Sequence, residues 1–130
     1  MRQITPTALI LFLSGCSTLQ TGYRQPLEVA YQSVHLVDTL QTASLHNSRC
    51  YSESDSAWAL GSHPSVARTA VWGAGLSVGH AYVTGRLVES GHPTLAKVWG
   101  WLTFGDAAYS VGNNYSIGIR IGSSNNECVK

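Results

Sequence analysis

The chain has 130 residues, of which 44% are hydrophobic and 12% are charged, and its formal net charge is +1. A chain of this length forms one small domain. It contains neither a basic patch nor an acidic tail, so its charge pattern gives no support to nucleic acid as a partner. The charged fraction is well below the usual value of about 25%, which predicts that much of the surface is hidden in protein or lipid.

The first 15 residues have the features of a secretory signal. Arg2 supplies a basic start, residues 4–13 are mostly apolar, and Ser14 and Gly15 are small residues of the kind that precede a cleavage site. The apolar stretch is too short to span a bilayer, which needs about 20 residues. We therefore expect residues 1–15 to be a signal peptide. An ordinary signal followed by a chance cysteine, or a short buried segment, is the alternative.

The sequence Leu13-Ser14-Gly15-Cys16 resembles the lipobox of bacterial lipoproteins. The resemblance implies cleavage before Cys16 and acylation of Cys16, with several acyl chains giving stable attachment to a membrane. In that family the next residue influences sorting. Ser17 is not the aspartate associated with inner-membrane retention, so the resemblance implies the outer membrane, facing the periplasm. The mature chain would hold seven basic and seven acidic residues, because cleavage removes only Arg2.

Two further cysteines, Cys50 and Cys128, remain if Cys16 is acylated. In an oxidising compartment such a pair favours one disulfide. By the chain-entropy model, closing so long a loop stabilises the fold by about 4 kcal/mol. Two free thiols, or a cross-link between chains, are the alternatives.

The pattern of the mature chain predicts an all-α fold, a small bundle of three main helices in one domain over residues 27–130. Residues 16–26 are small and polar, which indicates a flexible tether from Cys16. Pro26 suits the first turn of a helix, and the periodicity predicts a helix over about 27–45. After it we expect a loop over 46–62 with a short helical turn near residues 56–60, a helical hairpin over about 63–121, and a tail over 122–130.

The expected first helix carries a narrow polar stripe on an otherwise apolar surface. This pattern predicts packing on more than one side of the helix. Asp38 lies outside the stripe, on the apolar face, where it either reaches water at the rim or pairs with an arginine of a later helix. The stripe consists of Glu28, Gln32, His35, Thr39 and Thr42.

The second half contains an internal repeat. The sequence 63–68 (HPSVAR) matches 92–97 (HPTLAK), and the later Trp-Gly and Ala-Tyr pairs of the first unit also recur in the second. Each unit reads as a helix with a proline near its start, so the two form a glycine-rich hairpin that turns near Gly91. Gly75 and Gly79 are four residues apart, a spacing typical of close helix packing. The hairpin either embeds in a membrane or stays outside it, because its segments are apolar but interrupted by polar residues.

An antiparallel hairpin would bring His80 and Asp106 within about a turn of each other. We therefore expect a buried polar pair there, structural in a soluble bundle and functional at mid-depth in a membrane. The sequence identifies neither a nucleophile nor a pocket, so we expect no enzyme and no cofactor. The five histidines show no paired ligand spacing, so we expect no metal site.

The segment 115–121 alternates apolar with polar or small residues, as a strand does. It has no partner strand in this chain. Either it pairs with another chain, or the preceding helix continues through Asn113 and Asn114.

These features together predict a non-enzymatic, lipid-anchored protein of the bacterial cell envelope with a structural or interaction role. The membrane is its partner through the acyl anchor, and a protein partner or a homo-oligomer is left open. One alternative is a phage- or prophage-type envelope modifier with a membrane-embedded hairpin. Another is a small periplasmic enzyme, which would need His35, Asp38, His80 or Asp106 to converge in one pocket.

Overall fold

The computed structural model describes residues 26–54 and 56–122, and within them it is all helical. The expected all-α class is therefore confirmed for this part of the chain. Cys16, Cys128, the predicted signal peptide and most of the tether lie outside the described residues. The elements in order are α2 (Pro26–Ser44), the 3-10 helix η1 (Leu45–Asn47), α3 (Ala57–Leu60), α4 (Val66–Glu89) and α5 (Pro93–Ser116).

Helices α4 and α5 begin in different ways, although both follow a His-Pro pair. The Ser65 side chain caps α4 by accepting a hydrogen bond of 3.2 Å from the backbone N–H of Arg68. Pro64 precedes this cap and is buried. Pro93 instead opens α5, where its missing N–H costs nothing.

Helices α4 and α5 end in the same hydrogen-bonded motif around a glycine. After α4, Gly91 has φ +80° and donates to the carbonyl of Val88, and His92 donates to the carbonyl of Leu87. After α5, Gly118 has φ +101° and donates to Tyr115, and Ile119 donates to Asn114. These are Schellman motifs, which stop a helix and satisfy its last carbonyls.

The alternating segment 115–121 lies at the end of α5. Helix α5 continues through Asn113 and Asn114 to Ser116, and turns follow it up to residue 122. The segment is therefore not a strand. Of its apolar side chains only Ile119 is buried, whereas Tyr115, Ile117 and Ile121 are exposed, so the alternation does not mark a buried face.

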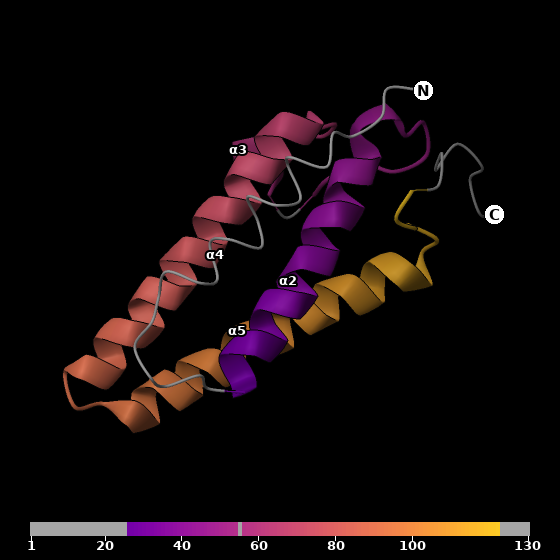
Figure 1. Ribbon diagram of the computed structural model, residues 1–130. Coiled ribbons are helices and arrows are strands. Elements are labelled where there is room, and N and C mark those ends of the chain that lie inside the picture. Colours follow the sequence, from indigo (N-terminus) through magenta and orange to yellow (C-terminus); the bar gives the residue numbers. More distant parts are fainter. Residues whose placement is uncertain (1–25, 55, 123–130) are drawn as a thin grey trace.

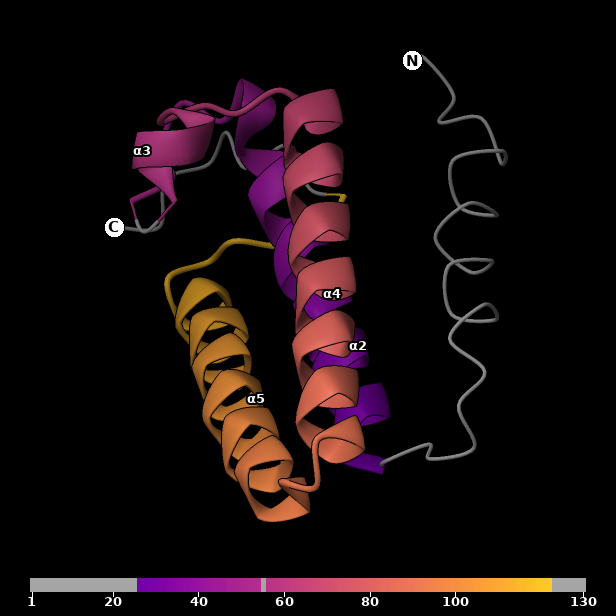
Figure 2. The same ribbon diagram turned by 90° about the vertical axis from the view of Figure 1, so that its left-hand side faces the viewer.

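Helix α2 packs against both α4 and α5, which diverge from their connecting turn (Figures 1 and 2). Along α4, Glu28 meets His80 and His35 meets Gly73, so the two helices run antiparallel. Along α5, contacts near the start of α2 fall near Gly100 and later ones near Asn114, so these helices run parallel.

Two glycines allow α2 to approach its neighbours closely, and they are not the two that the spacing predicted. A Cβ added at Gly73 would lie 2.6 Å from Thr39 Cγ2, and one at Gly100 would lie 2.7 Å from Leu27 Cδ2. At Gly75 and Gly79 an added Cβ would meet nothing within 4 Å. The prediction that these two glycines mediate helix packing is wrong, because both lie on the exposed outer side of α4.

The polar stripe of α2 faces the other helices rather than solvent. His35 and Thr42 are buried, and Glu28, Gln32 and Thr39 are half-buried against α4. Apolar side chains of α2, such as Val29 and Leu40, are exposed instead. Polar side chains therefore take part in the helix contacts beside the buried Tyr31, Ala96 and Ala107, and many large apolar side chains lie on the surface.

None of the helices within the described residues combines the length and the apolar character that crossing a bilayer requires.

Candidate functional site: a buried histidine between three helices

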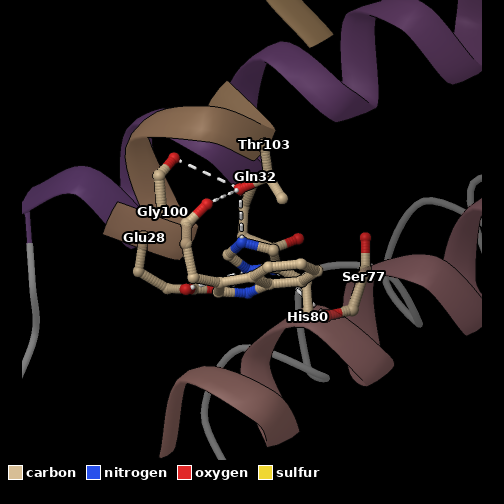
Figure 3. A network of polar contacts seen from close by, with 7 residues as sticks. Glu28, Gln32, Ser77, His80, Gly100 and Thr103 are labelled. Atoms are coloured by element: carbon tan, nitrogen blue, oxygen red, sulfur yellow. Dashed lines mark hydrogen bonds and ion pairs between the residues drawn. The ribbon is translucent and has the colours of Figure 1, made fainter. Parts of the chain in front are cut away.

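The centre of the domain is His80, which projects from α4 and is 4% exposed. Its Nδ1 lies 3.1 Å from Glu28 Oε1 and 3.0 Å from Oε2, so the carboxylate of α2 faces it with both oxygens. Its Nε2 lies 2.8 Å from the hydroxyl oxygen of Thr103 on α5. One imidazole thus joins the three long helices, as Figure 3 shows.

The partners of His80 hold both of its ring nitrogens. A carboxylate only accepts hydrogen bonds, so Nδ1 must donate to Glu28. The Thr103 hydroxyl has one proton and lies 2.8 Å from the carbonyl oxygen of Trp99, to which it donates. Its oxygen is then free to accept from Nε2. Both ring nitrogens are then engaged, Nδ1 by Glu28 and Nε2 by Thr103.

Aromatic rings enclose the imidazole on both faces. The Tyr31 ring stacks on His80 with 3.7 Å between centroids, and Trp99 lies 5.4 Å away on a nearly parallel plane. His35 extends the stack beyond Tyr31 at 5.5 Å. Stacked aromatic rings add to the stability of the cluster beyond the apolar area that they bury.

Glu28 is held by α2 and α4 together. Gln32, one turn further on, donates to Glu28 Oε1 at 2.8 Å and to the backbone carbonyl of Ser77 at 3.1 Å (Figure 3). Burial on its own raises the pKa of the Glu28 carboxyl. The hydrogen bonds from His80 and Gln32 and the charge of His80 outweigh burial and lower this pKa below 4.5.

The other titratable members of the stack stay uncharged near neutral pH. Burial lowers the pKa of His35 from 6.5, although its Nε2 lies 3.1 Å from the carbonyl oxygen of Gly73, a contact that opposes the shift. Burial, with the nearby carboxylates as the smaller cause, raises the pKa of Tyr31 to about 12.

Asp106 is not the partner of His80. It is exposed on α5, and both ring nitrogens of His80 are engaged by Glu28 and Thr103. The expected buried pair is therefore wrong in its second member. Thr103 lies one turn earlier on the same helix and faces α4, whereas Asp106 is turned toward solvent.

Asp38, placed on the apolar face of α2 by the sequence, meets an amide near the end of α5. The Asn114 side chain donates to Asp38 Oδ1 at 3.4 Å and to Gln41 Oε1 at 3.3 Å. Asp38 is half-buried, and Gln41 is 3% exposed. These contacts form a second polar connection between α2 and α5, far from His80.

The order of carboxylate, imidazole and hydroxyl in this cluster is that of a hydrolase triad. Its surroundings do not suit nucleophilic chemistry. The Thr103 proton is engaged by a helix carbonyl, and His80 is enclosed by Tyr31 and Trp99. A groove along α3 and α4, lined by residues 59–76, does not include these side chains. The arrangement instead fixes the relative positions of three helices.

The described residues contain no group of three or more histidine, cysteine or acidic side chains placed to hold a metal ion. Cys50 is disulfide-bonded, and the other two cysteines of the chain lie outside the described part. Pairing of Cys50 with Cys128 stays a prediction.

The outer sides of α4 and α5 expose large apolar side chains. Val71 is 75% exposed, and Tyr109 is 74% exposed. Arg68 and Arg86 bracket the apolar outer side of α4, and no acidic residue lies between them. The other large exposed apolar residues of these two helices are Val66, Leu76, Val78, Tyr82, Val83, Leu95, Val98, Trp101, Leu102 and Tyr115.

Comparisons of the chain with protein-family models, with curated proteins and with solved structures find no match. Function has to be inferred from the residues themselves.

Sequence reasoning identified His80 as buried but missed Glu28 and Thr103. The sequence pattern assigns Glu28 to the polar stripe of α2 but does not show that this stripe faces α4. A buried histidine needs hydrogen-bond partners. The polar stripe of α2 offers such partners, so pairing this stripe with His80 would indicate the register between α2 and α4.

Proposed function

We propose that this protein is a non-enzymatic lipoprotein of the bacterial cell envelope, anchored by acyl chains on Cys16 and acting by contact at the membrane. The outer membrane, facing the periplasm, is the proposed location, because Ser17 follows the acylated cysteine. The inverted polarity of the described domain carries the proposal: polar side chains join the helices, and large apolar side chains face outward.

Inverted polarity suits a domain whose surroundings are partly apolar. Monomeric soluble proteins rarely expose large contiguous apolar patches, and such patches mark contacts with proteins or lipid. The lipobox-like sequence supplies a reason for a membrane to be nearby. Protein partners or a second copy of the chain remain compatible with the same surface.

We further propose that α4 and α5 are two copies of one helical unit, which together form a hairpin. At an offset of 27 residues, the close-approach glycines Gly73 and Gly100 correspond. The same offset relates further residues with like exposure, which supports the duplication. The pairs are Thr69 with Ala96 and His80 with Ala107, which are buried, and Val71 with Val98 and Tyr82 with Tyr109, which are exposed.

Membrane fractionation of the full chain tests the anchor. Wild-type protein and a Ser17→Ala control should remain with membranes after a carbonate wash, whereas Cys16→Ser should be released. Retention of Cys16→Ser would show that the acyl anchor is not what holds the protein. Release of the wild type would show that no stable anchor exists.

A further inference from the structure

A groove runs along the outer side of α4 next to α3, away from the His80 cluster. It has a volume of about 490 Å³, within the range of about 300–1,000 Å³ that is usual for small-molecule sites. Arg68 is the only charged residue among the described residues that line it. The lining residues are Ala59, Leu60, Ala67, Arg68, Val71, Trp72, Gly75 and Leu76.

Aromatic rings and a glycine shape this groove. Trp72 in the lining makes an edge-to-face contact with Trp58 of α3, with 5.6 Å between ring centroids, and Trp58 is 81% exposed. Gly75 lines the groove without a side chain to fill it. An added Cβ at this position would meet nothing within 4 Å. The stretch from Ala67 to Leu76 extends about 14 Å along the helix axis.

Arg68 lies at the start of the groove and is exposed. It forms no ion pair with any residue that the structure describes. An apolar groove with a single cation at one end complements a molecule that has an apolar chain and one anionic end.

We propose that this groove binds a single acyl chain ending in a carboxylate, with the carboxylate at Arg68 and the chain along Val71, Trp72 and Gly75. One groove and one cation fit a single-chain fatty acid better than a two-chain phospholipid, whose second chain would stay outside. The inference does not depend on acylation of Cys16, and the two are tested separately.

Dodecanoate binding to the full chain carrying Cys16→Ser tests the site, because this variant lacks its own acyl chains. Calorimetry should show saturable binding at monomeric dodecanoate concentrations. Affinity should rise about four-fold for each CH2 group added between octanoate and dodecanoate. Quenching of tryptophan fluorescence by 12-bromododecanoate should be weaker in a Trp72→Phe variant, with residual quenching from Trp58, which lies 5.6 Å from Trp72.

Gly75→Leu and Gly79→Leu form a matched pair for this test. Both glycines lie on the outer side of α4 in open space, but only Gly75 lines the groove. Displacing two CH2 groups of the ligand should weaken dodecanoate binding about 15-fold in Gly75→Leu. Gly79→Leu should bind like the parent chain. Equal binding by the two variants would overturn the proposal.

The headgroup is tested without altering the groove. Arg68→Gln should weaken dodecanoate binding about two- to five-fold, as for an exposed ion pair, and leave dodecanol binding unchanged. Equal loss for both ligands would refute the carboxylate contact. Binding of phosphatidylglycerol vesicles but not of monomeric dodecanoate would overturn the site in favour of a bilayer. A change of oligomeric state in ligand-free Gly75→Leu would overturn it in favour of a second copy.

Discussion

Replacement of Gly73 by alanine tests the packing of α2 on α4. The new Cβ would lie 2.6 Å from Thr39 Cγ2 and 2.7 Å from Thr39 Oγ1. Thr39 has little freedom to move aside, because its hydroxyl donates to the carbonyl of His35 at 2.8 Å. The two helix backbones must therefore separate, which also lengthens the contact between His35 and the Gly73 carbonyl.

The free-energy cost of overpacking can be measured separately from the effect of helix propensity. Overpacking of this kind costs about 1–3 kcal/mol, and alanine in a helix returns up to about 1 kcal/mol relative to glycine. Gly79→Ala gains the same propensity on the same helix but meets no atom within 4 Å. The difference in unfolding free energy between Gly73→Ala and Gly79→Ala should therefore equal the overpacking cost, about 1–3 kcal/mol.

Urea unfolding of the full chain, followed by circular dichroism, measures both values. Thr39→Ala removes the two closest atoms and leaves Cβ of residue 39 at 3.3 Å. The double variant with Gly73→Ala should therefore be more stable than the sum of the single changes, by about 0.5–3 kcal/mol. Equal stability of Gly73→Ala and Gly79→Ala, or strict additivity with Thr39→Ala, would refute this packing.

Three further predictions concern the His80 cluster. Glu28→Gln removes the carboxylate that accepts from the buried His80 and should lower the unfolding free energy by about 1–3 kcal/mol, less than for a fully buried pair because the Glu28 side chain is 22% exposed. The exposed Glu89→Gln should cost about 0–1 kcal/mol, and equal losses would contradict the difference. The pKa of His35 is lowered from 6.5 in the folded state, so the unfolded state binds more protons as the pH falls below that value. Denaturant unfolding should therefore show the stability falling as the pH drops from 7 to 5. The same pH dependence of stability in a His35→Gln variant would contradict this. Because the pKa of Tyr31 is raised from 10.0 to about 12, stability should fall as the pH rises from 10 toward 12, and Tyr31→Phe should reduce this fall if the assignment holds.

The helices could be predicted because their signals are local. Pro26 and Pro93 mark helix starts, and Gly91 stops a helix through a hydrogen-bond pattern that needs only the adjacent turn. The same pattern at Gly118 ends α5 within the segment 115–121, whose structure the sequence leaves open. The all-α class follows from these signals and from the lengths of the periodic segments.

The interior could not be predicted because the usual rule of burial fails in this chain. The polar stripe of α2 faces α4 through Glu28, Gln32 and His35, although apolar periodicity predicts that such a stripe faces solvent. A buried polar network depends on the register between helices. Shifting α2 by one residue along α4 would separate Glu28 from His80. The alignment of the two helices cannot be derived from composition.

The unknown register between helices also explains two wrong predictions, the choice of Asp106 as the partner of His80 and the choice of Gly75 and Gly79 as packing glycines. Asp106 and Thr103 are three residues apart on α5, so a hairpin drawn from the sequence cannot decide which of them faces α4. Gly75 and Gly79 have the spacing of a packing motif, but Gly73 lies in the contact. Spacing along one helix does not show which face a third element covers.

Anchoring through Cys16 is the central claim of the account, and the mass of the N-terminal peptide of the protein isolated from its native membrane tests it most directly. The account predicts a peptide that begins at Cys16 and carries the added mass of acyl chains. A peptide that begins elsewhere, an unmodified Cys16, or a Cys16 joined in a disulfide to Cys50 would contradict it.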